Sequence, residues 1–411
     1  MFKNIKELGK DELVKGSLVL FFMMNAYNLL NYIFHFSMAR MLGPSGYGVL
    51  AVLMSFVYIF NVPSESIQNI ITNYTIKLNI KKEYGKVKFL FFKSLKKSVI
   101  ISFIIFLVLI PITIFLSAFL KIDFFLFLIT CSLIFFILSL PVLRGILQGR
   151  KKFFSLGSNM ILEGFIKVIF SIFLVFAGWK VYGAISAVLI SILLAFIFGF
   201  FFIKEIMKTK EEKVEFKGIY SYSTPFLISI LAIVLIYSLD IILAKRFFSS
   251  EIAGKYAVAS MLGKMIFFGT FAISKAMFPL SSESYENGKK TLFLLKKSLK
   301  IVFLISGIAL LAFLFFPSLI IRILFGSAYM GVSGILFIIG LSLTILSFTN
   351  LIVLYGLSIN KIKKNSFYLL IFVILEIALL SIFHSSLLQF SLVFLTVNCL
   401  MLLYSLMVIK K

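Results

Sequence analysis

The chain has 411 residues, of which 61% are hydrophobic and only 14% are charged. A soluble globular protein has roughly 45–50% apolar residues, so this composition excludes a water-soluble domain and favours a protein of the lipid bilayer. Basic residues outnumber acidic ones by 41 to 16. They fall in alternate connections between apolar runs, so we expect no nucleic-acid partner.

Apolar runs of about 20 residues, long enough to cross a hydrocarbon core as α-helices, recur along the chain. They predict an all-α polytopic membrane protein with twelve transmembrane helices. The predicted spans are 16–38, 48–72, 98–120, 123–147, 157–178, 181–203, 222–244, 255–279, 298–320, 331–355, 366–383 and 387–408.

Lysine and arginine alternate between rich and poor connections. Four lysines precede the first span, Arg40 stands alone in the first connection, and eight basic residues lie between Lys77 and Lys97 in the second. The alternation continues to the end of the chain, and it breaks if one span is removed. By the positive-inside rule we expect a multi-pass protein of the cell membrane with both termini in the cytoplasm.

The two halves of the chain resemble each other. Residues 39–51 and 244–259 each leave a span through alanine and a basic residue, turn through small residues, and re-enter on glycine and tyrosine. Aligning Gly46 with Gly254 gives an offset of 208, and Gly145 aligns with Gly356 at an offset of 211. Internal repeats of this kind are a common plan of transporters.

The repeat predicts two six-helix bundles, 1–203 and 222–411, joined by the charged cytoplasmic linker 204–221. Six spans per half is an even number, so both halves insert in the same orientation. A pseudo-two-fold axis along the membrane normal then relates them.

Polar side chains in the predicted spans are costly in lipid and usually face a cavity or a partner. They form stripes at helical spacing in spans 1, 2 and 8, and Asp240 lies in span 7. The alternative is hydrogen bonding between helices without substrate contact. The residues that we predict to line a substrate-binding cavity are Asn25, Asn28, Tyr32, His35, Asn61, Glu65, Gln68, Asp240, Lys264 and Lys275.

Two further features involve charge within spans. Glu163 and Lys167 are four residues apart with the acid first, which favours a self-neutralising structural pair. Glu376 has no local partner, and it is either a proton or cation site or a residue facing lipid headgroups. The sequence has no HExxH, CxxC or nucleotide-binding loop, so we expect no catalytic site, no metal and no cofactor.

Short motifs then indicate a family. Ala39-Arg40-x-Leu42-Gly43-Pro44-x-x-Tyr47-Gly48 after span 1 resembles the opening of the polysaccharide (O-antigen-type) flippases, within the multidrug/oligosaccharidyl-lipid/polysaccharide exporter superfamily. Ala253-Gly254-x-Tyr256-Ala257-x-Ala259, with Phe278-Pro279 closing span 8, resembles the second half of that family. So does the turn Leu143-Arg144-Gly145-x-Leu147-Gln148-Gly149 after span 4.

The resemblance implies two bundles forming a V around a central cavity. It also implies flipping of a lipid-linked oligosaccharide or polysaccharide precursor to the outer face by alternating access. Related flippases bind a diphosphate with cationic cavity residues, a role that here falls on residues such as Lys264 and Lys275. The partners are then a lipid-linked glycan and membrane lipids, and we expect a monomer.

Two other functions remain open. An H⁺- or Na⁺-coupled multidrug-type exporter of the same superfamily shares the fold, and Asp240 or Glu376 would couple it to the ion. A membrane-embedded glycosyltransferase or polymerase is the third reading, but it requires a large outer loop or an acidic catalytic motif. We therefore expect a transporter and not an enzyme.

Overall fold

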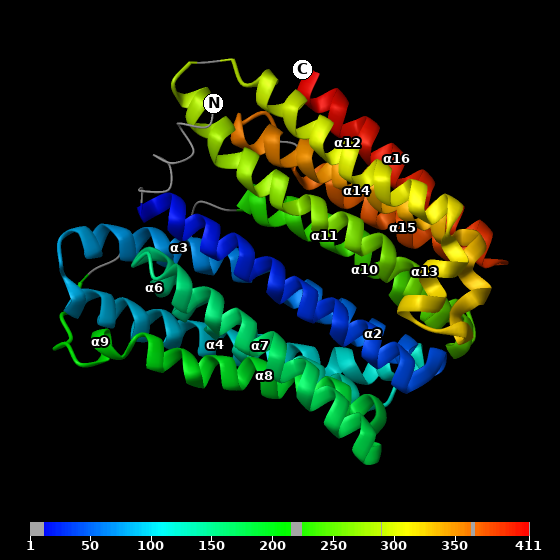
Figure 1. Ribbon diagram of the computed structural model, residues 1–411, viewed down its shortest axis with the longest axis horizontal. Helices are drawn as coiled ribbons and strands as arrows, with labels where there is room; N and C mark the ends of the chain where they lie inside the picture. Colours follow the sequence, from blue (N-terminus) through cyan, green and yellow to red (C-terminus); the bar gives the residue numbers. More distant parts are fainter. Residues whose placement is uncertain (1–11, 215–223, 289, 363–365, 411) are drawn as a thin grey trace. The chain divides into compact units, whose positions relative to one another are not determined.

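The computed structural model describes residues 12–214, 224–288, 290–362 and 366–410 (Figure 1). Within these ranges every regular element is a helix. The chain divides into two compact units, which we call unit 1 (Met1–Leu42 and Phe60–Tyr222) and unit 2 (Gly43–Ile59 and Ser223–Lys411).

The helices follow the hydropathy pattern. Helix α2 (Glu12–Phe60) begins in unit 1 and ends in unit 2. The other elements of unit 1 are α3 (Val62–Ile80), α4 (Tyr84–Leu120), α5 (Phe124–Ser132), α6 (Ile134–Gly149), α7 (Phe153–Leu174), η1 (Val175–Trp179), α8 (Lys180–Phe202) and α9 (Lys204–Met207). The other elements of unit 2 are α10 (Thr224–Phe247), α11 (Ser250–Glu286), α12 (Leu292–Phe315), α13 (Pro317–Leu324), η2 (Ser327–Val332), α14 (Ser333–Ser358), η3 (Ser366–Tyr368), α15 (Leu369–Ile382) and α16 (Leu387–Lys410).

Nine segments of the described chain are long and apolar enough to cross a membrane. Two of them, Phe22–Ile80 and Phe153–Phe202, each contain two predicted spans, and the shorter apolar helix Ser366–Ile382 corresponds to the eleventh. The prediction of an all-α, multi-pass membrane protein is therefore confirmed.

Helix α2 is interrupted at Gly43, whose backbone has φ 66° and ψ 177°. Glycine tolerates this conformation because it has no Cβ, and Pro44 then suits the first turn of the helix that follows. Asn61 separates that helix from α3. The segment Gly43–Ile59 groups with unit 2, and we call it the strap. The predicted N-terminal bundle 1–203 contained this whole segment, so the division between the bundles differs from the prediction here.

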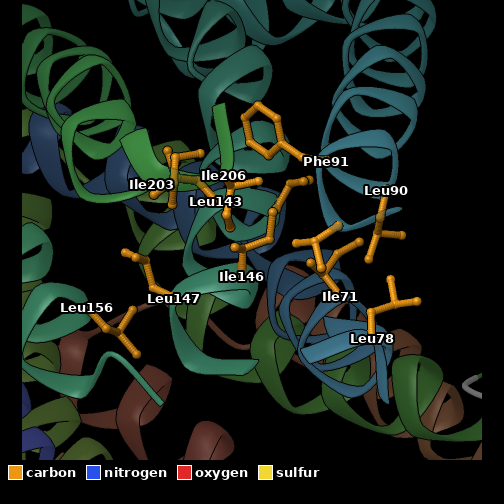
Figure 2. Close-up of a cluster of buried hydrophobic side chains, with 12 residues drawn as sticks. Ile71, Leu78, Leu90, Phe91, Leu143, Ile146, Leu147, Leu156, Ile203 and Ile206 are labelled. Carbon is orange, nitrogen blue, oxygen red and sulfur yellow. The ribbon is translucent and has the colours of Figure 1, made fainter. Parts of the chain in front are cut away.

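Unit 1 has a continuous apolar core built by α3, α4, α6, the start of α7 and α9 (Figure 2). Gly145 and Gly149 let α6 approach α3 closely, because a Cβ at Gly145 would lie 2.8 Å from the Gln68 carbonyl and one at Gly149 2.6 Å from Thr75 Cβ. Both glycines lie inside α6, so the predicted turn after span 4 is instead helix, and its glycines serve helix packing.

The first part of the predicted linker 204–221 belongs to unit 1. Ile206 is 1% exposed and lies in the apolar core, and Lys88 Nζ donates hydrogen bonds to the Met207 and Thr209 carbonyls, at 2.7 and 2.9 Å. The hydropathy pattern missed this because a single buried isoleucine among charged residues produces no apolar run. Residues 215–221 lie outside the described chain.

In unit 2, α11 packs along α14 and α12, α14 packs on α16, and α10 lies against α11 and α15 (Figure 1). The strap is seated on this unit at both ends. Tyr47 contacts the rings of Phe325 and Tyr329, and Tyr58 contacts those of Tyr237 and Phe268. The two loop sequences that echo each other therefore meet within one unit.

Candidate functional site

A buried polar network in unit 1 joins α2, α6 and α7. The Arg144 guanidinium lies 2.6 Å from the Glu163 carboxylate, and these side chains are 12% and 7% exposed. Tyr27 donates its hydroxyl hydrogen to Glu163 at 2.8 Å, and Arg144 Nε donates to Asn159 Oδ1 at 2.9 Å. Asn159 in turn donates to the Ala195 carbonyl of α8, so four helices fix the orientation of the arginine.

Lys167 completes the unit 1 network without an acidic partner of its own. Its ammonium group donates to the Asn31 side-chain oxygen and lies 5.8 and 5.3 Å from the ring centroids of Tyr27 and Phe34. The residue is 5% exposed, and no carboxylate of the described chain lies within ion-pair distance of it. Aromatic faces stabilise a cation but do not neutralise its charge.

The predicted pairing of Glu163 with Lys167 is therefore wrong. Four-residue spacing places the two side chains on one face of α7, but Glu163 instead binds Arg144, nineteen positions away in the sequence. The guanidinium is the better partner for a buried carboxylate because its planar N–H groups match carboxylate geometry. Two cations and one carboxylate leave the unit 1 network with a surplus positive charge.

Unit 2 contains a second buried group of charges, on α10, α11 and α15. Lys264 Nζ lies 3.7 Å from Asp240 Oδ1, and the two residues are 1% and 0% exposed. Asp240 Oδ2 accepts hydrogen bonds from Ser260, at 2.6 Å, and from Tyr256, at 3.4 Å. Three side chains of α11, sixteen to twenty-four positions after Asp240 in the sequence, thus surround its carboxylate.

Glu376 is the third charged member of this group, and it is fully buried. It interacts electrostatically with both Asp240 and Lys264, yet neither of its carboxylate oxygens has a hydrogen-bond partner in the part of the chain that the structure describes. We call Asp240, Lys264 and Glu376 the acid–lysine–acid cluster. With both acids ionised the cluster would carry a net negative charge, and with Glu376 protonated its charges balance.

The predicted cavity residues are found in different surroundings. Asn25, Asn28, Asn61 and Lys275 are exposed, and Tyr32, Glu65 and Gln68 are half-buried. Gln68 donates to Gln148 Oε1 of α6 at 2.8 Å, which is the helix-to-helix alternative that the sequence left open. His35 is buried beside the Phe34 ring.

Lys264, which was predicted to line a cavity, is 1% exposed. Its ammonium group is buried against Asp240, which compensates the cost of placing a charge inside the unit. Asp240 and Lys264, both predicted site residues, are joined by an ion pair. This ion pair depends on how α10 packs on α11, so it cannot be predicted from the sequence pattern of either helix alone.

Sequence reasoning missed Arg144 as a site residue, because it lies next to the basic run at 150–152 and was assigned to the cytoplasmic end of span 4. Its partner Asn159 follows in span 5. The signal available in the sequence was Asn159 itself, a polar residue fifteen positions after Arg144 on the neighbouring helix. Among the described residues no group of three or more His, Cys, Asp or Glu side chains is suited to hold a metal ion.

Outside the membrane, two carboxylates have pKa values below their ordinary range. Lys152 and Arg150 lie 2.8 and 3.1 Å from Glu205 Oε2, and the hydrogen bond from Lys152 is the main cause of the lowered pKa. Asp123 accepts hydrogen bonds from Tyr182 and from the backbone N–H of Phe125, which lower its pKa in the same way. Asp123 is the N-cap of α5, Glu205 lies in the first turn of α9, and neither belongs to a buried network.

The sequence model of a family described as "Polysaccharide biosynthesis protein" matches residues 37–333, more than half of the chain. No curated protein sequence matches it. Among solved structures, an inward-facing multidrug resistance MATE transporter of the MOP superfamily aligns with a TM-score of 0.75 at 14% identity, covering 93% of this chain and 94% of that one.

The lipid II flippase MurJ in an inward closed conformation aligns with a TM-score of 0.71 at 18% identity, covering 97% of this chain and 88% of the other. At these identities the alignments establish the fold alone. It is the fold of membrane transporters.

Proposed function

The chain belongs to the polysaccharide biosynthesis protein family, and we propose that it flips a lipid-linked oligosaccharide or polysaccharide precursor from the cytoplasmic to the outer face of the membrane. Transport proceeds by alternating access. The observation that carries this proposal is the family match over residues 37–333. The likeness in fold to a lipid flippase is consistent with it.

The unit 1 network supports an anionic substrate. A buried positive charge without a counter-ion is costly, and an arriving phosphate of a lipid-linked glycan would repay that cost. Lys167 is the residue we assign to this contact, because Arg144 forms a direct ion pair with Glu163 while Lys167 interacts with that carboxylate only at longer range and contacts an amide and two rings. Asn31 and Tyr27 hold its ammonium group in place.

The exposed and half-buried predicted residues complete the proposed substrate path. Asn25, Asn28 and Tyr32 lie on α2, which also carries Tyr27 and Asn31. Amides and a phenol suit the hydroxyl groups of a glycan, since each donates and accepts hydrogen bonds. His35, Asn61, Glu65, Gln68 and Lys275 are kept as further candidates for this path.

The acid–lysine–acid cluster supports an ion gradient as the source of energy. With both acids ionised this buried cluster of unit 2 would carry a net negative charge, which a proton on Glu376 or another monovalent cation would neutralise. Asp240 and Lys264 are thereby moved from the substrate path to the coupling site. We propose that transport proceeds without ATP hydrolysis.

The same cluster favours a second candidate function, a cation-coupled exporter of small molecules. Deleting the gene separates the two. A flippase defect leaves lipid-linked glycan on the cytoplasmic face and removes the surface glycan. If surface glycan is unchanged while sensitivity to cationic drugs rises, the exporter is correct.

The alternation of basic residues supports a topology with both termini in the cytoplasm. A reporter fused after Lys411 should be cytoplasmic, and one inserted at the exposed Ser45 should be external. A cytoplasmic signal from the Ser45 insertion would reverse the assignment of faces. It would also reverse the proposed direction of transport.

A further inference from the structure

The strap links the two units along the chain. It groups with unit 2, yet from Phe60 onward the same predicted span belongs to unit 1. Gly43, with its positive φ, interrupts the helix at one end. At the other end Asn61 separates the strap from α3 but keeps helical backbone angles, φ −75° and ψ −14°. The strap can therefore pivot at Gly43 while it stays continuous with the start of α3, as hinge-bounded elements do.

At the first end the strap is locked by backbone contact. A Cβ at Gly48 would lie 2.9 Å from Gly254 Cα, and one at Gly254 would lie 1.7 Å from the Pro44 carbonyl oxygen. At the other end the contact is aromatic, with ring centroids of Tyr58 and Tyr237 6.0 Å apart. Aromatic pairs are weaker and more adjustable than a backbone fit, with a typical strength of about 0.5–1.5 kcal/mol.

The aromatic end of the strap leads directly to the acid–lysine–acid cluster. Lys264 Nζ lies 5.7 Å from the Tyr237 ring centroid, so one ammonium group contacts both the Asp240 carboxylate and the ring that holds Tyr58. Tyr237 is 5% exposed and packs on Phe267 as well, which leaves it little freedom to move independently. A shift of Lys264 therefore changes the surface on which Tyr58 rests.

The charge of Glu376 decides where Lys264 is drawn. When Glu376 carries a proton, the neutral acid leaves Lys264 to Asp240 and the Tyr237 ring. When the proton leaves to water, a second buried carboxylate competes for the same ammonium, and both of its oxygens lack another donor in the described chain. Lys264 is then pulled away from Tyr237, and its cation–π contact weakens.

We propose that the strap senses the protonation of the acid–lysine–acid cluster, through the contacts of Lys264 with Tyr237 and of Tyr237 with Tyr58. This inference rests on the proposed function, in which the cluster holds the coupling ion. It assigns Tyr58 as a positioning residue that reports the state of the cluster to the span continuing into α3. The proposal requires that the strap has two arrangements and that the protonation of the cluster changes the equilibrium between them.

Two tyrosines of the described chain contact the cluster: Tyr256 on α11 donates to Asp240, and the Tyr237 ring on α10 lies 5.7 Å from Lys264 Nζ. At the far end of α10, Lys245 is paired with Ser250. The helix α16 carries no acidic residue between Leu387 and Lys410. A change of charge at Glu376 is therefore the event to test.

Hydrogen exchange of the full-length protein in lipid nanodiscs tests the proposal without any substrate. Protection of peptides from Gly43–Ile59, corrected for intrinsic exchange rates, should fall roughly tenfold from mildly acidic to alkaline pH. Glu376→Gln should abolish this fall, because its side chain cannot become charged. Tyr58→Leu should give low protection with no dependence on pH.

Tyr47→Leu is the matched control. Tyr47 anchors the same strap on Phe325 and Tyr329 instead of on Tyr237, so the variant should lower protection while keeping the pH response. A wild-type strap whose protection does not change with pH would overturn the proposal, as would a full response in Tyr58→Leu. A protein that fails to flip lipid-linked glycan but shows these exchange patterns would refute the proposed function alone.

Discussion

Unit 1 buries two basic side chains and one acidic one, whereas unit 2 buries two acidic side chains and one basic one. In unit 1, Arg144 and Lys167 lie near the single carboxylate of Glu163, and in unit 2 Asp240 and Glu376 both interact with the single ammonium of Lys264. Under the proposed function, the anionic substrate and the coupling cation would be recognised in different units, so that one need not displace the other.

The largest loss of stability should follow removal of Arg144, the cation of unit 1 that is paired with Glu163. Arg144→Met leaves the Glu163 carboxylate buried without its partner, and we expect a loss of about 3–5 kcal/mol in unfolding free energy. Denaturation of purified protein in detergent measures it. Adding Glu163→Gln should recover most of the loss. If Arg144→Met alone is as stable as the wild type, the ion pair does not contribute to stability in this way.

The next effect concerns the strap, which belongs to unit 2. Gly254→Ala places a methyl group against the Pro44 carbonyl, and overpacking of this kind costs about 1–3 kcal/mol. Gly269→Ala lies in the same helix α11 with no atom within 4 Å of the new Cβ, and it should leave the thermal midpoint unchanged or raise it. Equal midpoints for the two variants would contradict the close fit of the strap.

The smallest expected effect compares the contribution of a surface ion pair to stability with that of the buried pairs. Glu205 has a lowered pKa, so its pair with Lys152 and Arg150 stabilises the protein above the ordinary pKa of glutamate and is lost as pH falls below it. Glu205→Gln should cost at most about 1 kcal/mol at neutral pH and nothing in acid, because its carboxylate is 59% exposed.

Glu211→Gln, a change on the same segment outside this pair, is the control for Glu205. Thermal midpoints measured across the acid range would compare the two variants. A deficit in Glu205→Gln that persists in acid would exclude the ion pair as its cause.

The sequence was sufficient to predict the helices, because twenty-residue apolar runs leave a chain in lipid few alternatives to helix. It was not sufficient to predict how the buried charges pair. Spacing favoured Lys167 as the partner of Glu163, whereas packing of α6 on α7 supplied Arg144. Local periodicity describes one helix at a time, and a pair between helices depends on their packing.

The strap shows the same limit at a larger scale. Hydropathy placed residues 48–72 in one span, and the glycine motif at 43–48 predicted a turn. The unit to which the span belongs depends on contacts such as that of Gly48 with Gly254. The repeat aligns Gly254 with Gly46, two positions before Gly48. Glu376 was predicted to be either a proton or cation site or a residue facing lipid headgroups, and its interaction with Asp240 and Lys264 appears only in the folded chain.

The account is tested most directly by a flipping assay in proteoliposomes that contain a labelled polyprenyl-diphosphate-linked glycan, with and without an imposed proton gradient. We expect the gradient to accelerate flipping by the wild type and Lys167→Met to reduce flipping about tenfold under both conditions. Glu376→Gln should flip at one rate regardless of the gradient. If Lys167→Met flips the glycan as fast as the wild type, the assignment of the anionic substrate to unit 1 is wrong.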